Sequence, residues 1–321
     1  MTRAWWATGL LVVAACSGSD ATIPRAQSSD ATSPTGGATS SGGGRGAGAS
    51  SPPGAPPDAG APPSGPWPGS SVILLPFGVQ KSATTPCGAA VTDLEQHLPA
   101  MYGTQYDVPD DCIAWAEALT IGIDAHVTNY ENPYASMGIA AGGFYVMNSQ
   151  MAFVTEPAGT KLANVASHVP ASLHGSLFQN ELVDSLGDWN DTPTFILDEW
   201  VVYTNGATAA VELGKAGKIP SPRDGVSGAL ELTLYALAFG ASVEPATLST
   251  QLLQFLAWNA ERAMDLYRAG AAMPVFSGAA QASLYSAWKT SADAVPLRNF
   301  ARRVFGGPYV TKVLEIGAAS E

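Results

Sequence analysis

Residues 192–203 read TPTFILDEWVVY and predict a helix at the centre of the folded region. Thr192 can cap a helix and Pro193 fits the first helical position, so the two together mark a helix start. The apolar residues that follow recur at helical spacing. Further on, Asn205 and Gly206 predict a break or bend, because both residues favour turns.

Helical periodicity continues on both sides of this segment. Upstream, Ser172 can cap a helix that runs to about Leu186. Downstream, apolar residues again recur at a spacing of three to four. These patterns predict helices at about 226–240, 246–269, 279–293 and 296–305.

A strand pattern precedes these helices. Residues 142–154 hold two short apolar runs separated by Asn148-Ser149, which predicts a β-hairpin. We expect its outer strand at a sheet edge beside a groove. Residues 72–75 predict another short strand. The predicted fold class is therefore α+β, a mainly helical domain with a small N-terminal sheet or hairpin.

The first residues carry an export signal. In residues 1–15, Arg3 is followed by an apolar stretch too short to span a bilayer core of ~30 Å, as in a signal peptide. Residues 13–16, VAAC, resemble the bacterial lipobox, in which the cysteine is acylated. This resemblance implies that Cys16 anchors the chain in the cell envelope, and Ser17 implies the outer membrane. A secretory signal with a chance cysteine is the alternative.

A low-complexity segment follows the signal. Residues 16–69 consist largely of Gly, Ser, Ala, Pro and Thr and have no apolar face to bury. We expect a disordered stalk with an r.m.s. length of about 40 Å. Residues 70–321 are predicted to form a single globular domain, and their length also suits two tightly joined lobes.

The cysteines and the charge narrow the possible partners. Cys87 and Cys112 form an even pair in an exported domain, which predicts a disulfide over free thiols or a metal site. The formal net charge of the chain is −12, which argues against nucleic acid as a partner. One basic cluster is interpreted as a solvated helix face. It comprises Arg298, Arg302, Arg303 and Lys312.

An acidic region stands out because standard catalytic motifs are absent. The sequence contains no G-x-x-x-x-G-K-[ST], G-x-S-x-G or H-E-x-x-H. Between Glu181 and Glu199 it carries six acids and no base. Acids at this density are typical of a solvated face, an ion site or a catalytic site.

This region resembles the gluzincin-type zincin metallopeptidases. In that family an edge-strand hairpin precedes a helix with H-E-x-x-H, and a later helix supplies a glutamate ligand with an aromatic residue one turn on. Residues 180–184, NELVD, occupy the place of H-E-x-x-H, while Glu199 and Tyr203 match the later glutamate and aromatic residue. The resemblance covers about residues 140–213 and implies a zincin-like core.

The donor atoms of this region argue against zinc. Asn180 and Asp184 stand where the family has histidines, and oxygen donors suit calcium or magnesium better than zinc. We therefore predict no cofactor. The spacing from Asp188 to Glu199 matches an EF-hand, but Pro193 replaces the required glycine, so only a looser calcium site stays open. A plain helical domain and a different active site are the other interpretations.

Two functions are compatible with these residues. The first is a membrane-anchored module that binds an envelope or extracellular ligand without catalysis, in a groove between the hairpin and the Glu199 helix. The second is a carboxylate- or metal-dependent hydrolase of envelope peptide or glycan, with Glu181 as general acid and Asp198 or Glu199 as base. Glu231, on an apolar helix, is interpreted as exposed, because a buried carboxylate would need a partner. The candidate catalytic residues are Glu181 and Glu199, and the candidate groove residues are Asn180, Asp184, Trp189, Asp198 and Tyr203.

Overall fold

A computed structural model gives the fold of the domain. The predicted signal peptide 1–15, the predicted lipidation site Cys16 and the predicted stalk 16–69 lie outside the described residues. Among the residues that the structure describes, no helix combines the length and the hydrophobicity needed to cross a bilayer. The described residues are 74–76, 78, 82, 86–97, 111–123, 141–276 and 279–315.

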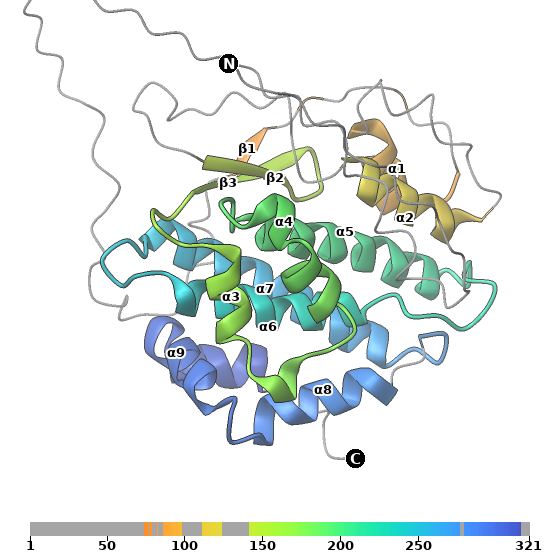
Figure 1. Cartoon of the computed structure of the whole chain (residues 1–321). Coiled ribbons are helices and arrows are strands. Elements are labelled where there is room, and N and C mark those ends of the chain that lie inside the picture. Colours follow the sequence, from red (N-terminus) through yellow and green to blue (C-terminus); the bar gives the residue numbers. More distant parts are fainter. Residues whose placement is uncertain are drawn as a thin grey trace, which may run out of the picture.

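Three long helices form the centre of the fold. They are α5 (Phe195–Lys215), α6 (Ser227–Ser242) and α7 (Thr250–Ala271), and each packs against the other two. Helix α6 lies in the middle of the helical layer (Figure 1). Every residue from 228 to 240 is buried, because α6 is apolar on all sides and is surrounded by other elements.

Shorter helices cover this centre. Helix α3 (Leu162–His168) packs along α6. Helices α8 (Ala279–Thr290) and α9 (Val295–Phe305) lie on the side of α6 away from the sheet (Figure 1). The four helices predicted downstream of residue 225 are confirmed as α6 to α9, with bounds shifted by a few residues. A short α10 (Gly307–Tyr309) and a π-helix (Val310–Leu314) end the described chain.

A small antiparallel sheet lies on the opposite side of the helices. It consists of β1 (Leu74–Pro76), β2 (Ala141–Tyr145) and β3 (Gln150–Thr155), in the order β1-β3-β2. Phe144 on β2 lies opposite Ala152 on β3. The predicted hairpin is confirmed, and so is the α+β class with its mainly helical content. A zincin-like core stays a prediction.

Two helices joined by a disulfide precede the hairpin. Helix α1 (Ala89–His97) and helix α2 (Cys112–Ile123) pack together. The predicted disulfide is present, since Cys87 and Cys112 have an S–S distance of 2.11 Å and a Cα–Cα distance of 5.4 Å. Constraining the unfolded chain in this way stabilises the fold by about 3 kcal/mol.

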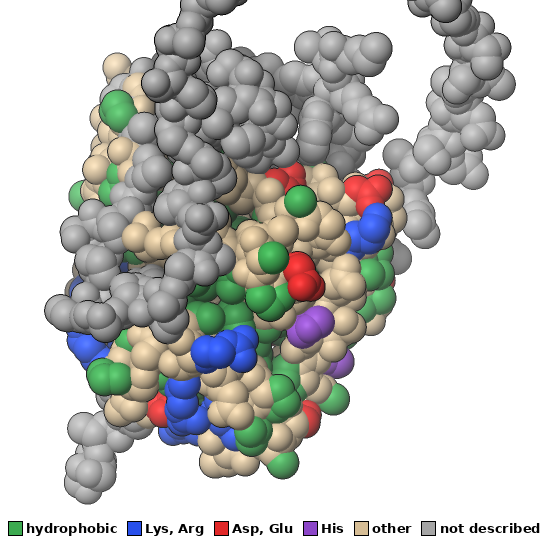
Figure 2. Space-filling model, turned by 90° about the vertical axis from the view of Figure 1, so that its left-hand side faces the viewer, with side chains coloured by type: hydrophobic (Ala, Val, Ile, Leu, Met, Phe, Trp, Pro, Cys, Tyr) green, Lys and Arg blue, Asp and Glu red, His purple; other side chains and the backbone are tan. Residues whose placement is uncertain are grey.

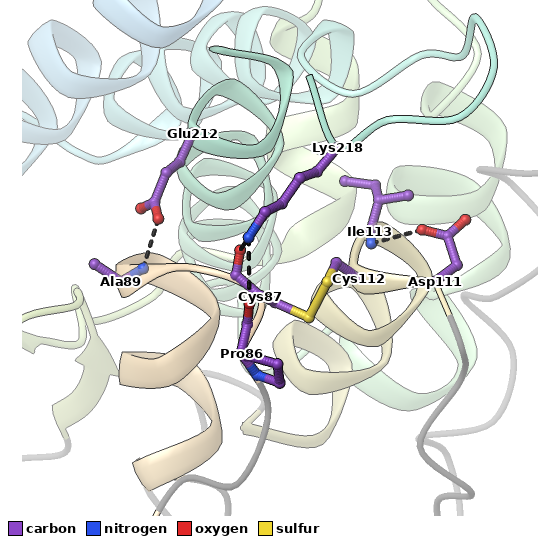
Figure 3. The surroundings of a disulfide bond; sticks show 8 residues. All are labelled: Pro86, Cys87, Ala89, Asp111, Cys112, Ile113, Glu212 and Lys218. Carbon is purple, nitrogen blue, oxygen red and sulfur yellow. Dashed lines mark hydrogen bonds between the residues drawn. A yellow bond between two sulfur atoms is a disulfide. The ribbon is translucent and has the colours of Figure 1, made fainter. Parts of the chain in front are cut away.

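Helix α5 holds the start of α1 through charged side chains (Figure 3). The Glu212 carboxylate accepts the Ala89 and Ala90 N–H groups at 2.5 and 2.8 Å. These N–H groups lie at a helix N-terminus, where a negative charge is favourable. The Lys218 ammonium donates to the Cys87 carbonyl at 2.8 Å. The disulfide end of α1 is thereby fixed to the central layer.

The predicted helix from Ser172 to Leu186 is wrong. A 3₁₀ turn (Ala171–Leu173) is followed by a π-helix (Phe178–Asp184). The N–H and the hydroxyl of Ser172 both donate to the Asp293 carboxylate, at 3.0 and 2.6 Å. Ser172 therefore holds the loop before α9 and does not cap a helix.

Two details of α5 also differ from the prediction. Asn205 and Gly206 do not break the helix, because the Asn205 amide is buried and donates to the Tyr145 carbonyl at 2.8 Å. The α-helix begins at Phe195 instead of directly after Thr192. These tertiary contacts outweigh the weak local preferences of single residues.

Candidate functional site

The segment in the place of H-E-x-x-H is the π-helix Phe178–Asp184. A π-helix pairs residue i with residue i+5, and the Gln179 amide accordingly donates to the Asp184 carboxylate at 2.7 Å. Asp184 is exposed, whereas Glu181 is only 1% exposed. On an α-helix, residues four positions apart lie on the same face and can bind one metal ion. In this π-helix the same spacing does not bring Asn180 and Asp184 to a common site.

Glu181 has a second buried carboxylate as its neighbour. This is Glu231 on α6, which is 3% exposed, so the interpretation of Glu231 as exposed is wrong. Glu231 accepts the Tyr235 hydroxyl at 2.6 Å and the Leu177 N–H at 2.7 Å. Glu181 accepts the Asn180 amide at 2.9 Å. We call Glu181 and Glu231 the carboxylate pair.

The carboxylate pair is an acid–base group at neutral pH. Burial raises the pKa of Glu181 to about 7, an effect that the Asn180 amide opposes and the Glu231 charge reinforces. Burial also raises the pKa of Glu231, while its donors lower it. Because Glu231 accepts more hydrogen bonds, we assign the negative charge to Glu231 and the proton to Glu181. The two carboxyls titrate as a pair.

Residues 174–178 run along the carboxylate pair. Gly175 is required by close approach, because a Cβ atom there would lie 2.3 Å from a Glu231 carboxylate oxygen. The exposed Ser176 hydroxyl donates to Glu231 at 3.4 Å and links the pair to the surface. His174 is exposed and stacks on Phe178 at a centroid distance of 3.5 Å. Proton exchange between the pair and a molecule at this surface would pass Ser176.

The remaining predicted acids lie on α5. Asp198 is buried, at 1% exposure, and Glu199 is partly exposed. The carboxylate whose charge acts on Glu181 is Glu231. The structure therefore brings Glu181 together with an acid on α6, while the pairing of Glu181 with Glu199 stays a prediction.

The predicted aromatic residues pack within the fold. Trp189 stacks on Phe195 with a centroid distance of 4.9 Å and an interplanar angle of 7°. The Tyr203 ring lies against Gly228 of α6, where a Cβ atom would be 2.1 Å from the ring. Trp189 and Tyr203 therefore pack against neighbouring elements of the fold.

Comparison with models of protein families, with curated proteins and with solved structures finds nothing similar to the chain. The gluzincin resemblance therefore stays a prediction from residues 140–213.

The donor atoms of the zincin-like segment do not fit zinc. Asp184 is engaged by Gln179 at the surface, and Asn180 donates to Glu181. Within the described ranges, no group of three or more His, Cys, Asp or Glu side chains could hold a metal ion. In the acidic loop from Asp188, Asn190 accepts N–H groups at the start of α3 through its carbonyl and its side chain. This asparagine therefore acts as a helix cap.

The predicted basic cluster is only partly a solvated face. Arg298 is 7% exposed and donates to the Trp288 carbonyl at 2.5 Å, which corrects the interpretation for this residue. Arg302 pairs with Glu315, and Lys312 pairs with Glu261. Figure 2 shows Lys and Arg side chains in the lower half of one face, beside a central area of hydrophobic side chains. The ion pairs reduce the positive charge that Arg302 and Lys312 present to a partner.

Sequence reasoning missed the Glu231 side of the site. In the sequence, Glu231 stands out as a single charge in an otherwise apolar helix. Its spacing from Tyr235 also permits an i, i+4 contact. The Leu177 N–H lies 54 residues away in the chain. That partner becomes visible only in the folded structure.

Proposed function

We propose that this chain is an exported lipoprotein of the bacterial cell envelope, anchored through Cys16 to the outer membrane. Its folded domain binds an envelope or extracellular ligand without catalysis. The observation that carries the anchor is VAAC at residues 13–16, directly after an apolar segment of signal-peptide length. The Gly/Ser/Pro-rich composition of residues 17–69 supports a stalk between the anchor and the domain.

Membrane fractionation of Cys16→Ala tests the anchor. We expect the wild-type chain to sediment with membranes and to incorporate a labelled fatty acid. The variant should lose the label and leave the outer-membrane fraction, because two or three acyl chains hold a protein far more firmly than one or none. Ser19→Ala is the matched control and should behave as wild type. An unchanged membrane-bound fraction for Cys16→Ala would refute lipidation.

The proposal of binding without catalysis is supported by oxygen donors in place of the zinc histidines and by the surface position of Asp184. Metal analysis of the purified full-length chain tests it. We expect less than stoichiometric zinc after dialysis. Stoichiometric zinc together with peptide hydrolysis would overturn this part of the proposal and leave the anchor untouched.

The carboxylate pair favours a second candidate function, a carboxylate-dependent hydrolase of envelope peptide or glycan. Glu181, with its pKa raised to about 7, would act as general acid, and Glu231 would act as base. Both roles need a protonated and an ionised carboxyl at the same pH. The exposed Ser176 hydroxyl, which donates to Glu231, is where a substrate group would approach.

Release of soluble fragments from isolated envelope peptide and glycan tests the hydrolase. If this function holds, Glu181→Gln should abolish release while circular dichroism shows an unchanged helical fold. Glu244→Gln, at an exposed position after α6, is the matched control. Absence of any release by the wild-type chain, or equal release by Glu181→Gln, would remove this candidate.

A further inference from the structure

A second polar group, which is partly buried, lies beneath the hairpin, away from the carboxylate pair. At its centre is the guanidinium of Arg262 on α7. It donates to the Asn259 side-chain oxygen at 2.8 Å, to the Val146 carbonyl at 3.2 Å and to the Asn205 side-chain oxygen at 3.5 Å. It also lies 4.7 Å from the Trp258 ring centroid. Elements from three parts of the chain thus fix its position.

No acid among the described residues balances the charge of this guanidinium. Burial lowers the pKa of Arg262 to about 10, so the group still carries its charge at neutral pH. Within the part of the chain that the structure describes, no carboxylate forms an ion pair with Arg262. By contrast, Arg223 pairs with Glu117 at 2.7 Å. Arg298, which is more deeply buried than Arg262, donates to carbonyls at the C-terminus of α8, where the helix dipole is negative.

An unused hydrogen-bond donor lies beside this cation. Asn259 is fully buried, and its side-chain nitrogen has no hydrogen-bond partner among the described residues. Its oxygen accepts from Arg262, which fixes the orientation of the amide and leaves the nitrogen as a donor. The three hydrogen bonds of Arg262 also leave two of the five N–H groups of a guanidinium unused. Arg262 and Asn259 therefore hold unused N–H donors and a positive charge, and no further acceptor among the described residues pairs with them.

We propose that Asn259 and Arg262 form a binding site for a small oxyanion, a carboxylate or a phosphate group. An oxyanion supplies both the acceptors and the negative charge that this position lacks, and guanidinium groups bind such anions strongly. A bound water would satisfy the Asn259 nitrogen and leave the charge unbalanced. The site is independent of the anchor and of the carboxylate pair.

The surrounding polar contacts hold this site in a fixed geometry. The Asn205 amide donates to the Tyr145 carbonyl at 2.8 Å while its oxygen faces Arg262. The Tyr145 hydroxyl in turn donates to the Asp93 carboxylate at 2.6 Å. The side chains that contact Arg262 are thus positioned before an anion arrives. Because Asn259 is fully buried, contact of an anion with its nitrogen requires a shift of neighbouring side chains.

Thermal unfolding of the purified full-length chain tests the proposal. Acetate and inorganic phosphate are titrated separately, each against sodium chloride at equal ionic strength. We expect at least one oxyanion to raise the Tm above the chloride reference in a saturable way, as mass action requires of a ligand that binds the folded state. A response to acetate alone identifies a carboxylate ligand, and a response to phosphate alone identifies a phosphate ligand.

Variants decide whether Arg262 causes the response. Arg262→Met should abolish it, and Arg262→Lys, which keeps the charge but not the planar donor set, should weaken the apparent affinity at least tenfold. Arg303→Met is the matched control, because Arg303 also lies over an aromatic ring, 5.6 Å from the Phe300 centroid, but is exposed. Arg303→Met should respond as wild type. A wild-type response no larger than that to chloride, or an equal response in Arg262→Lys, would overturn the proposal.

Discussion

The carboxylate pair and Arg262 present the same electrostatic problem with opposite signs. Glu181 and Glu231 are buried with neutral donors as their hydrogen-bond partners, and Arg262 is held by neutral acceptors. In the described structure, neither group has an opposite charge within ion-pair distance. Burying an isolated charge is costly unless the charge is neutralised or paired.

The two groups differ in how they can be neutralised. A carboxyl can take up a proton, and burial raises the pKa of Glu181 to about 7, which favours proton uptake by this carboxyl near neutral pH. A guanidinium keeps its proton, since even a pKa lowered to about 10 leaves it charged. The acidic group therefore depends on pH, and the basic group depends on an anion. The predictions below test this distinction.

The largest effect is expected from Glu231→Leu. This change removes the acceptor of the Tyr235 hydroxyl and of the Leu177 N–H, two donors buried at this position. An unsatisfied buried donor costs roughly 2 kcal/mol, so the free energy of unfolding should fall by about 4 kcal/mol. Urea denaturation at pH 7 measures the loss.

Glu231→Gln is the control for this change. It keeps one acceptor oxygen and the shape of the side chain, so it should cost clearly less than Glu231→Leu. Equal losses for the two variants would mean that the hydrogen bonds to Glu231 contribute little and that the carboxylate pair is not held as described.

The next effect is the pH dependence of stability. The pKa of Glu181 is raised from 4.5 to about 7, so the folded state holds a proton that the unfolded state loses above pH 4.5. This contribution is present in full below pH 4.5 and is lost as the pH rises through 7. The expected loss is about 3 kcal/mol over this range. Urea denaturation between pH 4.5 and 8 measures it.

Glu181→Gln isolates this contribution. Burial also raises the pKa of Glu117 and Glu156, which adds a slope of the same sign in every variant. The test therefore compares the slope of the unfolding free energy against pH in the wild type with the slope in Glu181→Gln. A difference of zero between pH 5 and 7.5 would contradict the raised pKa of Glu181.

Replacing Arg262 should lower the free energy of unfolding by a smaller amount, and this loss should not vary with pH. Arg262→Met leaves the Val146 carbonyl and the Asn259 oxygen without their donor. At roughly 1 kcal/mol for each acceptor, we expect a loss of about 2 kcal/mol. The loss should be constant from pH 5 to 8, because the guanidinium stays charged throughout. A loss that grows as the pH falls would connect Arg262 to a titrating acid.

Periodicity predicted the helices well because burial dominates them. Helix α6 is apolar along its whole length, and the structure buries it on all sides. Local signals failed where a distant partner decides the conformation. Asn205 would favour a turn, but its amide bonds to Tyr145, 60 residues away in the chain, and α5 continues. Such a contact has no signature within a sequence window.

The candidate site was predictable only in part for the same reason. The acidic density around Glu181 was visible, and Glu231 was recognisable as a charge in an apolar helix. Their proximity depends on how the π-helix packs on α6. For Arg262 and Asn259, the i, i+3 spacing is in the sequence, but whether an acid pairs with Arg262 is decided by the fold, which places none there among the described residues.

The smallest effect should come from Asn259→Leu in the absence of oxyanions. Leucine has a similar shape, and it removes a buried nitrogen that has no acceptor among the described residues. This gain offsets the loss of the acceptor for Arg262, so urea denaturation should show a change within about 1 kcal/mol. With the responding oxyanion added, the wild-type chain should gain stability and the variant should gain less. Nearly equal stability without the anion and unequal stability with it would show that the Asn259 nitrogen serves the ligand and not the fold.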